Sequence, residues 1–167
     1  LRRLRKSHEV ALHIITALKH GKFLRNFLEI DTKDEIAKKV GIDRTYLYEW
    51  NSYLFSQIVA ACDLAIIPID LKIPFWFYKP ANKLLFFWRV AMPVLVDETP
   101  EYARLMKECE LDMVCHSDAD WADKLERYLG DETARRNAGT KAKDFVERHY
   151  GERQILSQWD RVLESIL

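Results

Sequence analysis

Short apolar runs alternate with amphipathic stretches along much of the chain. Between residues 62 and 102 the sequence is CDLAIIPIDLKIPFWFYKPANKLLFFWRVAMPVLVDETPEY. The apolar run 64–69 is too short for a core helix and rich in isoleucine, which predicts a strand buried on both faces. Pro80 suits the first turn of a helix, where no intrahelical N–H is needed. The apolar stretch after it predicts a buried helix that Pro93 ends, followed by a strand at 94–97.

The same alternation continues outside this unit. Further strands are predicted at 10–17, 46–50 and 111–116. Further helices are predicted at 33–40, 52–62, 100–109, 118–129, 131–149 and from Gly151 to near Leu167, with Asn51 and Asp118 among the caps. Residues 2–7 indicate a short piece of helix, and 23–30 are ambiguous. Strands alternating with helices predict an α/β fold, a Rossmann-like parallel sheet with helices on both faces, built as one domain over residues 1–167.

Basic residues gather where such a sheet binds ligands, at the carboxyl ends of its strands. Lys72, Lys79, Asn82 and Lys83 lie in or after the loop that follows the strand 64–69. The free N–H groups and the dipole of a helix start stabilise an anion. The pattern therefore predicts a phosphate site. The alternative is that Lys79 and Lys83 are solvated neighbours four residues apart and that Asn82 is a capping residue.

The order cDlaiiP…KP.NKLl.fw..amPV.v..tpeY and the closing HYGERQILSQWDRVLESIL resemble the nucleotide-sugar-binding half of GT-B glycosyltransferases of bacterial polysaccharide biosynthesis. The resemblance covers residues 46–167, and residues 1–45 match only in the order of elements. It implies a C-terminal domain that binds a nucleotide diphosphate sugar, for transfer to a saccharide or lipid-linked acceptor. It places Asn82 and Lys83, with Lys79, at the donor diphosphate, where this fold uses no metal and no further cofactor.

The resemblance also implies roles for residues after two other strands. Trp50, with Tyr48 and Asn51, would stack on or border the nucleotide base, although a core aromatic is the plainer explanation. Glu98 and Glu101 would accept hydrogen bonds from the transferred sugar, or would only favour the start of the next helix. The catalytic base is expected in an N-terminal, acceptor-binding half outside these residues.

One departure from the family pattern concerns two glutamates. Many enzymes of this fold have a Glu in the middle of the helix after Pro80 and another eight residues earlier, and these places fall near Phe86 and Tyr78. Either the ribose is held differently, or donor binding is altered or lost. The second case predicts an inactive homologue that serves as an interaction module.

The composition narrows the partners and the setting. The 167 residues carry 26 basic and 26 acidic side chains, so no global field favours nucleic acid. Three cysteines at no metal-ligand spacing and the lack of a long apolar run indicate a reducing, cytoplasmic setting without a bound metal. The basic LRRLRK start is either a surface helix start or a contact to a membrane or a partner domain. The lack of an initiator Met and of early glycines suggests a fragment whose first strand is missing.

Residues 34–50, DEIAKKVGIDRTYLYEW, also resemble a helix-turn-helix. In that case a second helix carrying Arg44, Tyr46 and Tyr48 would enter the major groove of DNA. The zero net charge and the β-favouring YLY oppose this alternative, and short matches of this kind often arise by chance.

Overall fold

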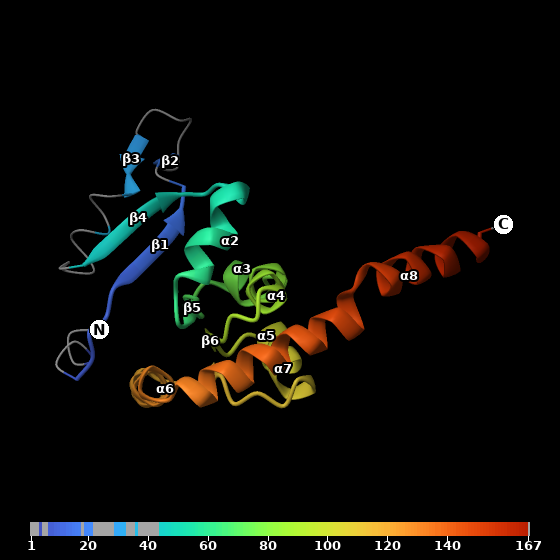
Figure 1. Ribbon diagram of the computed structural model, residues 1–167. Helices are drawn as coiled ribbons and strands as arrows, with labels where there is room; N and C mark the ends of the chain where they lie inside the picture. Colours follow the sequence, from blue (N-terminus) through green and yellow to red (C-terminus); the bar gives the residue numbers. More distant parts are fainter. Residues whose placement is uncertain are drawn as a thin grey trace. The chain divides into compact units, whose positions relative to one another are not determined.

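The computed structural model describes residues 4, 7–17, 19–21, 29–32, 36 and 44–166 (Figure 1). The chain divides into two compact units, Leu1–Cys62 and Asp63–Leu167. That the two act as the single donor-binding domain expected from the sequence stays a prediction.

The first unit is built on a parallel pair of strands. Strand β1 (Leu12–Thr16) pairs with β4 (Thr45–Glu49) over five residues. Strands β2 (Lys19–Gly21) and β3 (Glu29–Asp31) form a separate antiparallel pair. Helix α2 (Ser52–Ala60) follows β4, and the Asn51 side chain caps it by accepting hydrogen bonds from two backbone N–H groups. The strands predicted at 10–17 and 46–50 and the helix after Asn51 are confirmed.

Strand β4 decides against the helix-turn-helix. Thr45–Glu49 is hydrogen-bonded to β1, so the second helix that DNA recognition requires is not formed. The aromatic side chains of Tyr46 and Tyr48 favour a strand, and both stack on the ring of His13 across the pair. Ile36 is helical, and the rest of the helix predicted at 33–40 lies outside the described residues, as does most of 2–7 and 23–30.

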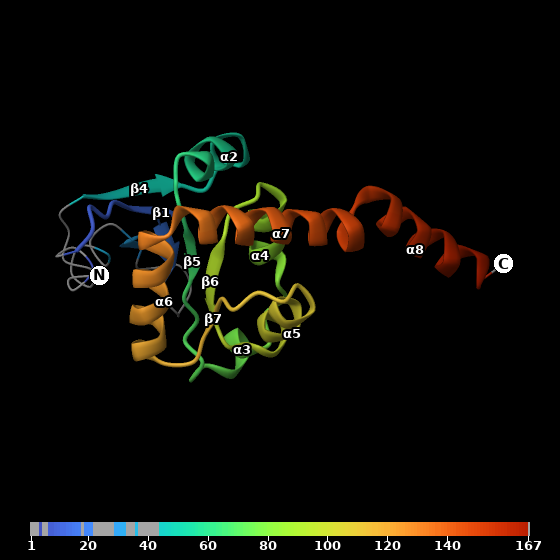
Figure 2. The same cartoon turned by 60° about the horizontal axis from the view of Figure 1, so that its bottom comes forward.

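The second unit contains a three-stranded parallel sheet. Its order is β5 (Ala65–Ile67), β6 (Val94–Asp97) and β7 (Val114–Cys115). Helices α4 (Asn82–Arg89) and α5 (Pro100–Glu108) connect consecutive strands. Because both crossovers advance in the same direction with the same hand, these helices share one face, and α6 (Asp118–Gly130) covers the other (Figure 2). The expected Rossmann-like α/β architecture is confirmed, although the described strands of the two units form separate sheets rather than one.

Two long helices complete this unit. Helix α7 (Glu132–Tyr150) packs against α4 and α6, and α8 (Glu152–Glu164) follows it after Gly151. The contact between α7 and α4 is close at Gly139, where a Cβ atom would lie 2.0 Å from the backbone oxygen of Ala91. Only glycine fits this approach.

The core of the second unit lies around the central strand. Val94, Leu95 and Val96 are fully buried, which is the expected behaviour of a strand covered on both faces. Trp88 of α4 is also fully buried and packs edge to face on Phe145 of α7, with ring centroids 5.8 Å apart. This packing fixes α4 over the sheet.

The crossover between β5 and β6 departs from the prediction in detail. The loop expected after β5 contains a one-turn helix, α3 (Pro74–Phe77). Helix α4 begins at Asn82 with Ala81 as its N-cap, so Pro80 precedes the helix instead of lying in its first turn. It ends at Arg89, well before Pro93, and Ala91 then adopts a left-handed φ of 57°.

Two further expectations about helices are wrong. Helix α4 was expected to be buried nearly all round, but it buries one face through Leu84 and Trp88 and leaves Phe86 exposed. The N-cap of α6 is Ser117, whose hydroxyl accepts from Asp120 N, and Asp118 is the first residue of the helix.

Candidate functional site

The carboxyl ends of β5 and β6 are tied together by one carboxylate. Asp97 accepts a hydrogen bond from the backbone N–H of Ile69 at 2.5 Å and another from Trp121 Nε1 at 2.7 Å. Ile69 begins the loop toward α3 and α4, Asp97 ends β6, and Trp121 lies on α6. The Asp97 side chain therefore sets the positions of three segments at this edge of the sheet.

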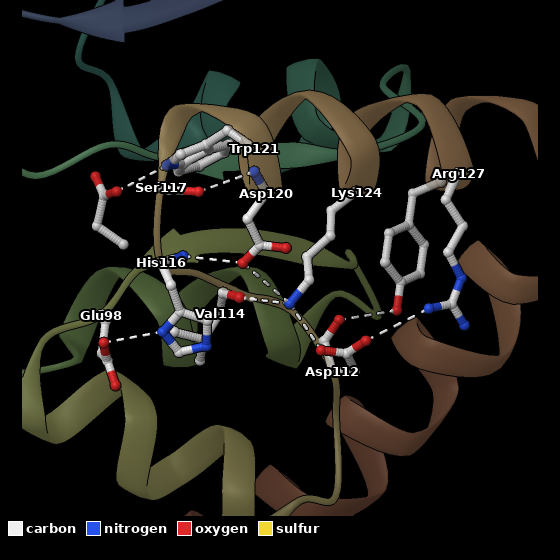
Figure 3. Close-up of polar contacts among 11 residues, drawn as sticks. Glu98, Asp112, Val114, His116, Ser117, Asp120, Trp121, Lys124 and Arg127 are labelled. Atoms are coloured by element: carbon white, nitrogen blue, oxygen red, sulfur yellow. Dashed lines mark hydrogen bonds and ion pairs between the residues drawn. The ribbon is translucent and has the colours of Figure 1, made fainter.

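The ends of β6 and β7 meet in a second polar contact. His116 Nδ1 lies 2.9 Å from Glu98 Oε2, and more than half of each side chain is exposed (Figure 3). The backbone N–H of His116 donates to Asp120 Oδ2 at 2.9 Å, which fixes the start of α6 beside it. The resemblance implies that Glu98 lies either at the transferred sugar or at the start of the next helix, and the structure shows that one of its oxygens already has a partner.

Lys124 holds α6 to β7 from inside a ring of oxygens. Its ammonium group lies 2.7 Å from Asp112 Oδ1, 2.6 Å from the carbonyl oxygen of Val114 and 3.6 Å from Asp120 Oδ2 (Figure 3). Burial lowers the pKa of Lys124, but the hydrogen bond and the charge of Asp112 outweigh it and the pKa is raised. The same hydrogen bond lowers the pKa of Asp112. With its charge satisfied in this way, Lys124 has a structural role.

The start of α4 is built without acceptors of its own. Within the described residues, no side chain accepts a hydrogen bond from its first turn, and that turn contains no acidic residue. Asn82 and Lys83 are exposed at this point. The ammonium group of Lys79 lies 3.5 Å from the centre of the Trp76 ring. Burial, and then the nearby charge of Lys83, lower the pKa of Lys79.

The start of α5 is already satisfied. The hydroxyl of Thr99, which is fully buried, accepts from Tyr102 N at 3.3 Å. Both oxygens of Glu101 accept from the guanidinium of Arg104, at 2.9 and 2.6 Å. The hydrogen bond from Arg104 lowers the pKa of Glu101. Glu101 therefore lies where it was expected, in a helix start, and its contact to a sugar stays a prediction.

Trp50 lies in the first unit, directly after β4. Its ring packs at a tilt on Phe55, with centroids 5.3 Å apart, and about half of the side chain is exposed. Asn51 is occupied as the cap of α2, and Tyr48 Oη lies 3.0 Å from His13 Nδ1. The stacking role of Trp50 stays a prediction.

The structure thus brings together Lys79, Asn82 and Lys83, and separately pairs Glu98 with a residue that the sequence did not indicate. A signal for His116 was present, because it is the last residue of the strand predicted at 111–116, and the carboxyl ends of neighbouring parallel strands are where such sheets bind ligands. Among the residues described, no three His, Cys, Asp or Glu side chains are gathered as a metal site would require. None of the described helices is long and apolar enough to cross a membrane.

A comparison with solved structures supports this architecture. No family model matches the sequence, and no curated protein matches it. Among solved structures the chain is similar to WaaG, a glycosyltransferase involved in lipopolysaccharide biosynthesis, with a TM-score of 0.63 and 17% sequence identity. The match covers 88% of this chain and 36% of the WaaG chain. The chain therefore has a glycosyltransferase-like fold and spans about a third of the length of that protein.

Proposed function

We propose that this chain is the donor-binding part of a GT-B glycosyltransferase and that the start of α4 binds the diphosphate of a nucleotide sugar. The observation that carries the proposal is the first turn of α4, which has no acidic residue and no side-chain cap and which has Lys79 and Lys83 beside it. The glycosyltransferase-like fold supports it, because the loops at the carboxyl edge are where such sheets bind ligands.

The chemistry of the site matches that of a diphosphate. The free N–H groups of the helix start and its dipole favour an anion by about 1 kcal/mol. Lys79 and Lys83 repel each other, and an anion between their ammonium groups would replace that repulsion with attraction. Asn82 would add a neutral donor. In this proposal the two lysines neutralise the leaving diphosphate, a task for which no metal or further cofactor is invoked.

The complete protein would be a transferase of the hexosyltransferase type, with a saccharide or lipid-linked acceptor. Its acceptor site and catalytic base would lie in an N-terminal half, so the 167 residues alone would bind the donor without transferring sugar. Glu98 and Glu101 would lie near the sugar, and Trp50 near the base. We place the protein in the cytoplasm, with a peripheral contact at the inner face of the membrane.

A second candidate is an inactive homologue that serves as an interaction module. Phe86 and Tyr78 favour it, because both are exposed aromatic side chains at the places where the resemblance leads us to expect the two glutamates. A donor ribose would meet no carboxylate there.

Calorimetric titration of the chain with UDP, ADP, GDP and TDP tests the proposal. At least one should bind, and binding should weaken as salt is raised. Lys83→Ala should lower the affinity about ten- to a hundredfold by removing a charge-assisted contact. Lys107→Ala, in the last turn of α5, is the matched control and should change little.

A second variant, Asn82→Asp, tests the same site with a side chain of nearly the same size as the one it replaces. Asn82→Asp introduces a carboxylate that the dipole of α4 favours, yet it should weaken diphosphate binding by about fivefold or more through repulsion. If Lys83→Ala and Lys107→Ala behave alike, the phosphate role of Lys83 is wrong. If no nucleotide binds even to the complete protein, the interaction module is the better assignment.

A further inference from the structure

A histidine and a glutamate face each other at the carboxyl edge of the sheet in the second unit. Glu98 directly follows β6 and His116 directly follows β7, and their side chains are 53% and 57% exposed (Figure 3). Nδ1 of His116 lies 2.9 Å from Oε2 of Glu98. Because a pair this exposed contributes little to stability, its main effect is to hold two polar groups in place at the surface.

The ends of the strands fix the position of this pair. Asp97, the residue before Glu98, accepts a hydrogen bond from the backbone N–H of Ile69, in the loop that leads to α3 and α4. The backbone N–H of His116 donates to Asp120 Oδ2 at 2.9 Å. Neighbouring strands lie about 4.8 Å apart, so the ends of β5 and β7 are roughly 10 Å apart, a distance that a hexosyl diphosphate can span.

The pairing decides which atoms remain for a ligand. An ionised carboxylate can only accept hydrogen bonds, so Nδ1 of His116 donates to Glu98 and, in the neutral imidazole, Nε2 is an acceptor. Among the residues that the structure describes, neither Nε2 of His116 nor Oε1 of Glu98 has a hydrogen-bond partner. Two neighbouring acceptors suit two adjacent hydroxyl groups, each of which can donate. Glu101 offers less, because Arg104 holds both of its oxygens.

The charges at the two ends of this edge have opposite signs. Residues 112–120 contain three acidic side chains and no lysine or arginine, and Glu98 adds a fourth carboxylate beside His116. Lys124 of α6 offsets part of this charge, since it is bound to Asp112. The start of α4, in contrast, has two lysines beside it and no acidic residue in its first turn. A donor with an anionic diphosphate and an uncharged sugar matches this arrangement.

We propose that Glu98 and His116 bind two adjacent hydroxyl groups of the transferred sugar and select uncharged hexoses over uronic acids. The proposal rests on the assignment of the diphosphate to the start of α4. Oε1 of Glu98 and Nε2 of His116 each accept a hydrogen bond from one hydroxyl group. The carboxylate of a uronic acid would be repelled by that of Glu98.

Calorimetric titration of the 167-residue chain with UDP, ADP, GDP and TDP, each paired with its glucose derivative, tests the proposal. The measured quantity is the Kd of the nucleotide-glucose divided by the Kd of the nucleotide, so an effect on diphosphate binding alone cancels. His116→Ala and Glu98→Ala should each raise this ratio about three- to tenfold, because each removes one hydrogen bond to the sugar.

A further variant, Glu98→Gln, separates the charge from the hydrogen bond. Its amide oxygen can still accept from a hydroxyl group, but it no longer repels an anion. The Kd for the glucuronate of the nucleotide that binds, divided by the Kd for the glucose derivative, should fall about fivefold. Glu110→Gln is the matched control and should change neither ratio. Glu110 is an exposed acid after the end of α5, bonded to Lys141 at 2.7 Å.

Three results would overturn the proposal: an unchanged glucose ratio in both alanine variants, an unchanged glucuronate ratio in Glu98→Gln, or an equal effect in Glu110→Gln. Equal weakening of nucleotide and nucleotide-glucose binding would assign the pair a structural role instead. If the nucleotides bind and only the ratios fail to change, the diphosphate assignment stands and this inference alone is wrong. If none of the four nucleotides binds, the diphosphate assignment fails and this inference fails with it.

Discussion

Helices α4 and α5 begin at the same edge of the same parallel sheet, and their first turns are built in opposite ways. The first turn of α5 receives the Thr99 hydroxyl and contains Glu101, which Arg104 holds by two hydrogen bonds. The first turn of α4 begins after Ala81, contains no acidic residue and lies next to two lysines. The two helix starts occupy equivalent places in the topology. They differ in whether side chains of the chain itself bind the free N–H groups of the first turn or balance its positive dipole.

The difference locates the candidate site better than residue types do. A helix start that its own side chains satisfy has little to offer an anion, whereas an unsatisfied start retains donors and a positive dipole. The chain forgoes the stability that a cap contributes, about 1 kcal/mol, at α4 and keeps it at α5. A local departure from favourable capping is expected where a ligand completes the structure.

Removal of the carboxylate that ties together the loop after β5, the end of β6 and helix α6 should have the largest effect. Asp97→Ala leaves Ile69 N and Trp121 Nε1 without their acceptor, so the free energy of unfolding should fall by about 2–4 kcal/mol. Urea unfolding of the parent chain and of the variant measures this loss in the free energy of unfolding. Trp121→Phe removes only one of the two contacts and should cost less. An equal cost for the two variants would show that the bond to Ile69 contributes nothing.

Removal of the cap of α5 should have a moderate effect confined to stability. Thr99→Ala leaves Tyr102 N without its acceptor and should lower the free energy of unfolding by about 1 kcal/mol. Thr99→Ser keeps the hydroxyl and should recover much of the loss. Nucleotide affinity, measured by calorimetry, should be the same in all three chains. A change in affinity would mean that the two helix starts are not separate in function.

The smallest effect should be on how the free energy of unfolding depends on pH. Lys79, beside the start of α4, should act at alkaline pH, and Glu101, in the first turn of α5, should act at acidic pH. The pKa of Lys79 lies below 10.5 in the folded chain, so between that lowered value and 10.5 the unfolded chain binds more protons. The free energy of unfolding contributed by this group therefore rises with pH in that window. For Glu101, whose pKa is also lowered, the contribution is present at neutral pH and is lost as acid is added.

Urea unfolding of the parent chain and of Lys79→Met, at neutral pH and near pH 10 (roughly the upper end of this window), measures the alkaline effect. The parent should gain stability relative to the variant as pH rises. A gain of the same size in both chains would assign the effect to other groups.

Local sequence patterns were sufficient for most elements. The buried strand β6, the cap Asn51 and the strand Thr45–Glu49 follow from apolar runs, capping residues and β-favouring aromatics. The gathering of Lys79, Asn82 and Lys83 was also predictable, because these residues are adjacent in sequence. What local patterns missed lies at boundaries: the turn α3, the start of α4 after Pro80 and its end at Arg89.

Contacts between distant residues were beyond such patterns. The pairing of His116 with Glu98 joins residues that follow two neighbouring strands, and the bond from Trp121 to Asp97 joins α6 to β6.

The sequence by itself determined an alternating α/β chain with a basic cluster after its first buried apolar run, because periodicity and capping act over a few residues. The tertiary structure decided which helix start is left unsatisfied, which carboxylates are already engaged and which aromatic side chains face water. Those properties depend on packing between segments far apart in the chain: the closure of α7 on α4 at Gly139, the tie from Asp97 to Ile69, and the outward face of α3.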